Sequence, residues 1–416
     1  MRIPSLFFLP LLPVLLCLPG LAQVVAPDTS AFVPVWAPDG SLLSAAQLDD
    51  TLKAVIKKQP NPTSIVVLMH GYHTMREDSS AQFQQVALRT QAEFAKRNEK
   101  VLVVGIQWES ALPGAGVPWD AEDVYFEALG RARNVGHQAS RQVLLLLQKQ
   151  YPKAHFSMWG HSLGCEVAAA CLMPELQYGD DAAKSSAFQP KQDIHIDMLA
   201  LCGSDLDYDI WYKGHVTFQA RRPRMRMAWM TMSPYMGERD KTLQVRSISR
   251  GRAGGAAFPR MTQEQADVVY KNRAIIFDNQ DIPTDHALLE YYSEARVQRL
   301  VSAAEYLVNP KAPEPLEMQE ADKVLASPNQ VEALTPWLDS PNLSTQVYAL
   351  WRLDHLLCGS SVHLCDETLD KMAQLMRNQP ALVRKERPTS SCKILSKGLW
   401  PTEAQMTRAG APSWND

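Results

Sequence analysis

Short apolar runs that alternate with helical segments constrain the fold of this chain more than any other feature. The runs 64–69 and 101–106 are short, rich in β-branched residues and apolar, as expected of strands buried on both faces. Further strands are predicted at 154–159, 194–201, 227–232 and 274–277, and helices over 81–98, 128–150, 165–172 and 288–307. This alternation predicts an α/β fold, with a mainly parallel sheet covered by helices on both faces.

The two ends of the chain differ from this central region. Arg2, an apolar run over 6–18 and a small-x-small triplet predict a signal peptide over residues 1–22, so we expect a protein that is exported, to the periplasm or secreted. Two prolines interrupt the apolar run and argue against a retained membrane anchor. Residues 23–308 would form the α/β domain. Residues 309–416 would form a proline-marked linker and a helical C-terminal region that offers a surface to a protein partner.

Composition and cysteine spacing exclude several classes of function. The net charge of −3 gives no basic bias, so no nucleic-acid partner is expected. Cys358 and Cys365 flank a short turn and, in an exported protein, are predicted to form a disulfide bond. Cys165, Cys171 and Cys202 lie in apolar elements and are predicted to be buried thiols. No cysteine or histidine spacing indicates a metal site, and no cofactor is expected.

The segment Gly160-His161-Ser162-Leu163-Gly164 carries the strongest indication of chemistry. It has the pattern G-x-S-x-G between a predicted strand and a predicted helix. In that context the two glycines remove side chains where strand and helix would collide, and the sharp turn lifts the Ser162 hydroxyl out of the sheet. The N-terminus of the following helix would help to stabilise an oxyanion. Ser162 is therefore predicted to be a catalytic nucleophile, in preference to an ordinary turn serine.

A second segment, His70-Gly71-Tyr72, follows the first predicted strand and fits an oxyanion hole. Hydrolases with such a nucleophile turn take one backbone N–H donor from the residue after the nucleophile and another from the loop after an earlier strand. Leu163 and Tyr72 are the predicted donors, and Gly71 would let the backbone approach the substrate. His70 and His161 are expected to support these loops and not to act as the base.

The base and the acid must follow the nucleophile along the chain, with the acid first. His286 lies in the loop between the last predicted strand and the closing helix, and is the predicted base. The acid has two candidates, because Asp240 and Asp205 each follow a strand that ends at the same edge of a parallel sheet. Asp205 also suits a helix start, where it would cap the first turn.

Residues from about 60 to 308 resemble the alpha/beta-hydrolase superfamily and, within it, a bacterial branch catalogued as an alpha/beta hydrolase of unknown function. The matching motifs are Val66-Val67-Leu68-Met69-His70-Gly71-Tyr72, Gln107-Trp108-Glu109, Gly160-His161-Ser162-Leu163-Gly164, Gly203-Ser204-Asp205-Leu206-Asp207, Arg239-Asp240-Lys241-Thr242-Leu243 and Arg252-Ala253-Gly254. The resemblance implies an alpha/beta-hydrolase fold and favours Asp240 as the acid. Two features depart from it: the segment around His286 only loosely matches the usual pattern, and the helical region after Pro310 has no counterpart.

Together these features predict an exported serine hydrolase, a carboxylesterase that cleaves small acyl esters through an acyl-enzyme on Ser162. His286 would accept the serine proton, and Asp240 would orient His286 and stabilise its charged form. The backbone N–H groups of Tyr72 and Leu163 would hold the oxyanion.

Two other interpretations of the same sequence stay open. One is a lipase or phospholipase that acts at a membrane, and the other is a non-catalytic binding protein on a hydrolase scaffold. Aromatic residues near the expected site would either line an acyl pocket or pack the surrounding loops. They are Trp108, Trp119, Tyr125, Tyr208, Trp211 and Tyr212.

Overall fold

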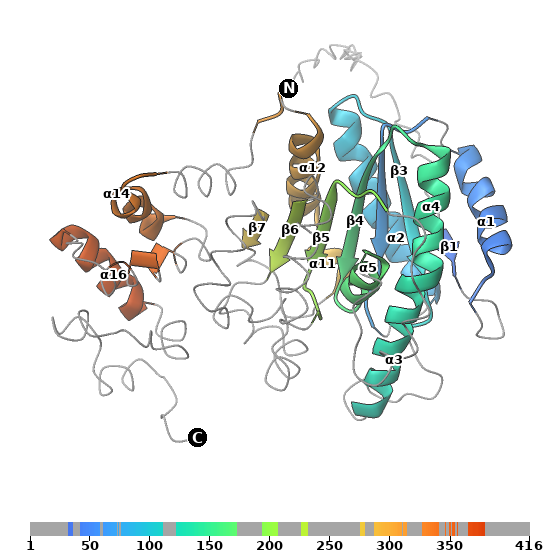
Figure 1. The fold of residues 1–416 in the computed structure, drawn as a ribbon, viewed down its shortest axis with the longest axis horizontal. Helices are drawn as coiled ribbons and strands as arrows, with labels where there is room; N and C mark the ends of the chain where they lie inside the picture. Colours follow the sequence, from blue (N-terminus) through green and yellow to red (C-terminus); the bar gives the residue numbers. More distant parts are fainter. Residues whose placement is uncertain are drawn as a thin grey trace, which may run out of the picture.

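The structure, a computed structural model, describes residues 32–35, 42–58, 61–72, 74, 76–110, 122–172, 194–206, 226–231, 275–278, 287–309, 311–313, 327–340, 346, 349–350, 352–353, 356 and 365–378. Within these residues, a parallel sheet is flanked by helices (Figure 1). The α/β fold predicted from the alternation of strands and helices is confirmed at this level. The predicted signal peptide lies outside the described residues.

The described strands form one sheet in the order β1-β3-β2-β4-β5-β6-β7, and all neighbouring strands are parallel. They are β1 (Phe32–Pro34), β2 (Ser64–Met69), β3 (Val101–Gln107), β4 (His155–His161), β5 (Met198–Cys202), β6 (Arg226–Thr231) and β7 (Ile275–Asp278). Gly160 of β4 pairs with Met69 of β2 on one side and Leu201 of β5 on the other. Because the strands run in the same direction, the segments that follow β2, β4 and β5 meet at one edge of the sheet.

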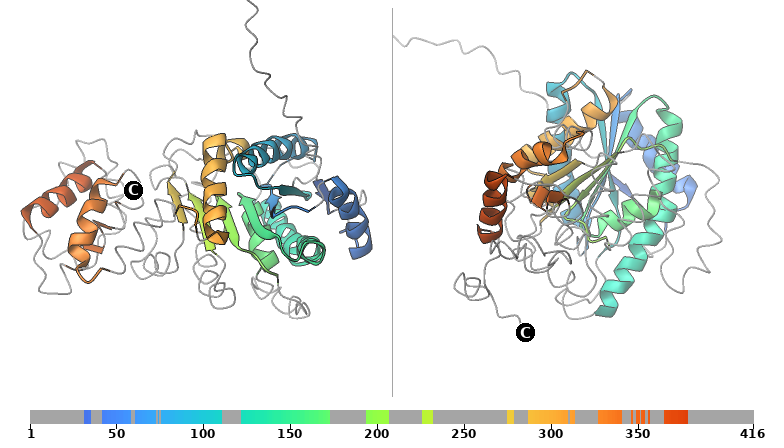
Figure 2. Two further views of the ribbon diagram at one scale, coloured as in Figure 1. Left: turned by 90° about the horizontal axis from the view of Figure 1, so that it is seen from above. Right: turned by 60° about the vertical axis from the view of Figure 1, so that its left-hand side comes forward.

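Helices cover both faces of the sheet, and successive strand residues point to alternate faces. In β2, Ile65, Val67 and Met69 belong to one hydrophobic cluster, whereas Val66 and Leu68 belong to another. The first cluster includes residues of α1 (Ala45–Lys58), α3 (Glu122–Val135), α4 (Arg141–Gln150) and α5 (Gly164–Leu172), and the second includes residues of α2 (Arg76–Lys96), α11 (Leu288–Tyr291) and α12 (Glu294–Val308). Figure 2 shows the two layers of helices on opposite sides of the sheet.

The long helix predicted over 128–150 begins earlier and changes its winding in the middle. A π-helical turn, η1 (Gly136–Ser140), separates α3 from α4. At this turn the helix packs closely on α5, because a Cβ atom built on Gly136 would lie 2.4 Å from the carbonyl oxygen of Val167. Glycine is therefore required for the two backbones to approach at this point.

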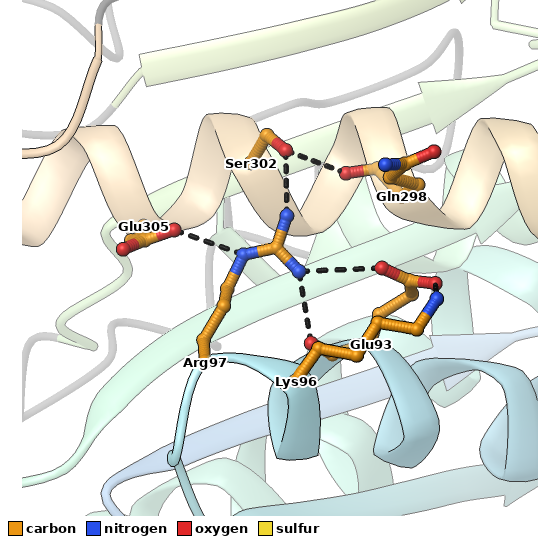
Figure 3. A network of polar contacts seen from close by, with 6 residues as sticks. All are labelled: Glu93, Lys96, Arg97, Gln298, Ser302 and Glu305. Atoms are coloured by element: carbon orange, nitrogen blue, oxygen red, sulfur yellow. Dashed lines mark hydrogen bonds and ion pairs between the residues drawn. The ribbon is translucent and has the colours of Figure 1, made fainter.

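Polar contacts join α2 to α12 on the other face (Figure 3). Arg97 follows the last residue of α2, and its guanidinium donates to a carboxylate oxygen of Glu305 (2.9 Å) and to the Ser302 hydroxyl (2.8 Å). It also donates to the backbone carbonyl of Glu93 (2.8 Å), whose carboxylate pairs with Lys96. These contacts lie near the start of β3, at the edge of the sheet opposite to the nucleophile turn.

The described part of the C-terminal region is helical, as predicted. It comprises α14 (Gln330–Leu334), a 3₁₀ turn η4 (Thr335–Asp339) and α16 (Asp366–Asn378), and Figure 1 draws it set off from the sheet. The helix predicted over 318–326 lies outside the described residues, as does part of the one predicted over 344–357. Over the described ranges, no helix combines the length and the apolar character needed to cross a membrane.

The cysteines correct one prediction and confirm another. Cys365 carries a free thiol, so the disulfide bond predicted between Cys358 and Cys365 is wrong. The Cys365 sulfur instead lies 3.1 Å from the Thr368 hydroxyl, where α16 begins; Cys358 itself is outside the described residues. Cys165, Cys171 and Cys202 are buried thiols outside any disulfide bond, as predicted.

Candidate active site

Ser162 lies on a sharp turn between β4 and α5, with its backbone in the left-handed region at φ 52°. A residue other than glycine seldom adopts this conformation, which costs roughly 1–3 kcal/mol. Hydrogen bonds on both sides hold it, from the Ser162 N–H to the carbonyl of Cys202 (3.0 Å) and from the Asp205 N–H to the carbonyl of Ser162 (3.2 Å). The strained strand–turn–helix geometry expected around Ser162 is present.

The two glycines of the motif are required by the packing of the turn. A Cβ atom on Gly160 would lie 2.9 Å from the Cα of Cys165, and one on Gly164 would lie 2.3 Å from the carbonyl oxygen of Met69. Real Cβ atoms do not approach other heavy atoms so closely. The turn is therefore packed against the start of its own helix on one side and against the end of β2 on the other.

The segment after β2 contacts the nucleophile directly. A Cβ atom on Gly71 would lie 2.7 Å from the Cβ of Ser162 and 3.2 Å from the carbonyl oxygen of His161. The next residue, Tyr72, is half-buried, and the Leu163 N–H donates to no backbone carbonyl of the described chain. The structure thus brings the backbones of Tyr72 and Leu163, the two predicted oxyanion donors, to the same edge of the sheet as Ser162.

His70 is a buried support of this loop. Its Nδ1 lies 2.9 Å from the carbonyl oxygen of Gly71, and its Nε2 accepts from the backbone N–H of Trp108 (3.3 Å). Burial lowers the pKa of His70 from 6.5 to about 4, so the imidazole is neutral near pH 7. A neutral ring that accepts at Nε2 carries its proton on Nδ1, which then donates to Gly71. These contacts are those of the structural role predicted for His70.

Trp108 is one of the six aromatic residues for which the sequence leaves two roles open. It is buried after β3, its indole Nε1 donates to the carbonyl of His70 (3.0 Å), and its ring stacks on the imidazole at 5.4 Å. These contacts are those of loop packing, the second of the two interpretations of the aromatic residues. Its place beside His70 follows from the register of β2 and β3, which pairs Met69 with Ile106. Nothing is described of the side chains of the other five aromatic residues.

Helix α11 rests on the residues that flank Ser162. The ring of Tyr291 lies 5.0 Å from that of His161, centre to centre. A Cβ atom on Gly203, which has φ +52°, would lie 2.5 Å from the Tyr291 ring. Arg89 of α2 holds the same short helix by donating to the carbonyls of Leu289 (3.1 Å) and Tyr292 (2.7 Å).

The structure describes one candidate acid, Asp205, but not the predicted base or the other candidate acid. Asp205 is buried after β5, next to the nucleophile turn through its backbone bond to Ser162. The Ser204 hydroxyl accepts from the Leu206 N–H (3.2 Å), a local turn that fixes the Asp205 backbone. His286 and Asp240 lie outside the described residues, so their predicted roles stay predictions. In the part of the chain that is described, no three histidine, cysteine or carboxylate side chains gather as metal ligands would.

Comparisons with known proteins add little to this geometry. No protein-family model matches the chain, and no curated protein is significantly similar to it. Among solved structures, an uncharacterized protein from Bacillus cereus ATCC 10987 is similar with 12% sequence identity and a TM-score of 0.34. That match covers 63% of this chain and 68% of the Bacillus protein. A likeness this distant indicates nothing about activity.

Proposed function

We propose that the protein is an exported serine hydrolase with an alpha/beta-hydrolase fold, and that it acts as a carboxylesterase on small acyl esters. The observation that carries this proposal is the backbone of Ser162, held at positive φ between β4 and α5 with Gly71 against its Cβ. Strain of this kind persists only where surrounding structure enforces it, and it gathers at catalytic sites. A turn that merely connected a strand to a helix would have no need of it.

The proposed reaction is acyl transfer to Ser162 and then to water. The Ser162 oxygen attacks the ester carbonyl as its proton passes to His286, and the N–H groups of Tyr72 and Leu163 hold the oxyanion. The protonated base then gives its proton to the departing alcohol. Water repeats the sequence and releases the carboxylic acid. Asp240 keeps the imidazole oriented and stabilises its charged form.

The contacts that α11 makes near the nucleophile turn support His286 as the base. Ala287, which is covalently bonded to His286, caps α11, and α11 contacts His161 and Gly203 through Tyr291. These contacts of α11 support the proposal that the residue before Ala287, His286, is the base.

A fluorophosphonate probe tests the proposal directly. We expect the mature wild-type protein to be labelled and to hydrolyse p-nitrophenyl esters, and Ser162→Ala to do neither. Ser140→Ala is the matched control, because Ser140 is also buried and its hydroxyl has no hydrogen-bond partner among the described residues. This variant should keep both properties.

The same assay separates the other interpretations. Ester hydrolysis that rises sharply with acyl length and only in the presence of lipid vesicles would replace the esterase with a lipase or phospholipase. A folded wild-type protein that is neither labelled nor active on any ester of the series would leave a binding protein on a hydrolase scaffold.

A further inference from the structure

Two residues that follow β3 hold the loop that follows β2. Trp108 bonds His70 at two points, through its backbone N–H to Nε2 and through its indole N–H to the carbonyl. The Ser110 hydroxyl accepts from the Thr74 N–H at 3.0 Å and lies 3.3 Å from the Thr74 carbonyl. The loop between His70 and Thr74 is therefore held at both of its ends.

His70 transmits this restraint to a single peptide bond. The Gly71 carbonyl accepts from the His70 Nδ1–H (2.9 Å) and from the Thr74 hydroxyl (3.3 Å). The peptide between Gly71 and Tyr72 is planar and trans, so its C=O and its N–H point in opposite directions. The Tyr72 N–H is thus turned away from the His70 ring, and a flip of this peptide would break both bonds to the carbonyl.

We propose that Trp108 and His70 are positioning residues, a clamp that fixes the Gly71–Tyr72 peptide so that the Tyr72 N–H faces the oxyanion beside Ser162. This inference rests on the proposed function and adds to it the residues that set its oxyanion hole. Donors of this kind act because they are oriented before the charge develops. A peptide free to rotate would lose that orientation without any loss of a catalytic group.

The chemical state of His70 suits the clamp. A neutral ring offers one donor and one acceptor, and here each faces the complementary backbone group. Protonation at Nε2 would place a second N–H against the Trp108 N–H and break that contact. The stacked indole and the Phe83 ring, 5.6 Å from the imidazole, exclude water from it and favour the neutral form.

Trp108→Phe tests the clamp, because it keeps an aromatic ring and removes the indole N–H. We expect kcat to fall by about 10- to 100-fold with KM little changed, since loss of a whole oxyanion donor costs about 10²–10³. Inhibition by a trifluoromethyl ketone, which forms an oxyanion on the enzyme, should weaken by the same factor. Trp159→Phe is the matched control. Trp159 is fully buried in β4 and its indole N–H has no hydrogen-bond partner in the part of the chain that is described, so kcat should stay near that of the wild type.

Two substitutions of His70 separate its nitrogen atoms. His70→Asn can keep an N–H donor near the position of Nδ1, whereas His70→Gln places its amide nearer the position of Nε2. The clamp requires the donor to Gly71. We therefore expect His70→Asn to have a kcat near that of the wild type and His70→Gln to have a lower one. Equal loss in the two variants would contradict the assigned direction of restraint.

A structural measurement decides the clamp independently of catalysis. Nitrogen-15 NMR should find the wild-type His70 neutral with its proton on Nδ1 at pH 6, and Trp108→Phe should speed amide hydrogen exchange at Tyr72. If neither holds, the clamp is wrong whatever the enzyme does. If both hold and the enzyme is active, but Trp108→Phe and Trp159→Phe have the same kcat, the peptide does not serve the oxyanion. Absence of labelling and hydrolysis in the wild type would remove the proposed function, and NMR and exchange would still decide the clamp.

Discussion

At the residue scale, two aspartates compete for one role in the proposed triad. Asp205 is buried beside the nucleophile turn, while the sequence context favours Asp240. The acid holds the base in its correct tautomer and stabilises the imidazolium, so removal of the acid lowers kcat strongly. We expect Asp240→Asn to lower kcat by about 10³-fold or more. Asp205→Asn should cost far less, because it retains the backbone N–H that bonds Ser162.

Circular dichroism of both aspartate variants provides the control for folding. If both are folded and Asp205→Asn is the more damaging, the role passes from Asp240 to Asp205. The burial of Asp205 would then reflect its contact with the base and not the local turn that it makes.

Single residues also show where the sequence was informative about the site. Gly71, Gly160 and Gly164 could be placed in advance, because only glycine fits where backbones touch, and the motif states its own spacing. The hydrogen bond from Trp108 to His70 could not be predicted from the sequence, since it joins residues 38 positions apart and depends on the register of β2 and β3. The wrong disulfide has the same origin: spacing between cysteines does not give the distance or direction between their Cβ atoms.

At the scale of elements, the sequence predicts strands where a run is apolar on both faces, as in β2 and β3. It does not predict β1, because three residues at the edge of the sheet are too few to show a pattern. The helix α1 is also absent from the predicted elements, although Leu48, Leu52 and Val55 have helical spacing and are buried. The π-helical turn at Gly136 lies where the helix packs closely on α5. This is a tertiary contact, so no local sequence pattern indicates it.

The polar contacts between α2 and α12 lead to a prediction about these elements. Arg97→Ala should lower the free energy of unfolding by roughly 2 kcal/mol, because it removes charged hydrogen bonds and leaves the largely buried Glu93 without this partner. Glu305→Gln, which keeps a hydrogen-bond acceptor, should cost less. Lys53→Ala, which breaks only exposed pairs with Asp49 and Asp50, should give no measurable change. Urea unfolding followed by circular dichroism measures the three, and a loss in Lys53→Ala equal to that in Arg97→Ala would contradict this account.

At the scale of the whole molecule, buried and exposed histidines should give stability opposite dependences on pH. The folded pKa of His70, about 4, lies below its usual 6.5, so the unfolded chain takes up a proton first as the pH falls. Its contribution is therefore present above pH 6.5 and lost towards pH 4. The hydrogen bond that the His155 ring donates to the Asp197 carboxylate raises the pKa of His155, whose contribution is present below pH 6.5 and lost as the pH rises through its folded pKa. His155 is half exposed, so solvent screens its effect.

We therefore expect the protonation of His70 to cause the fall in the free energy of unfolding on the acid side of the pH curve. Its shift corresponds to about 3 kcal/mol between pH 6.5 and 4. His70→Asn, which cannot titrate, should flatten the fall in the free energy of unfolding over that interval, even if it is less stable than the wild type at pH 8. His155→Gln should leave the fall in place. Denaturant unfolding at half-unit steps from pH 4.5 to 8 gives the slopes, and a wild-type slope in His70→Asn would mean that some other buried group controls acid stability.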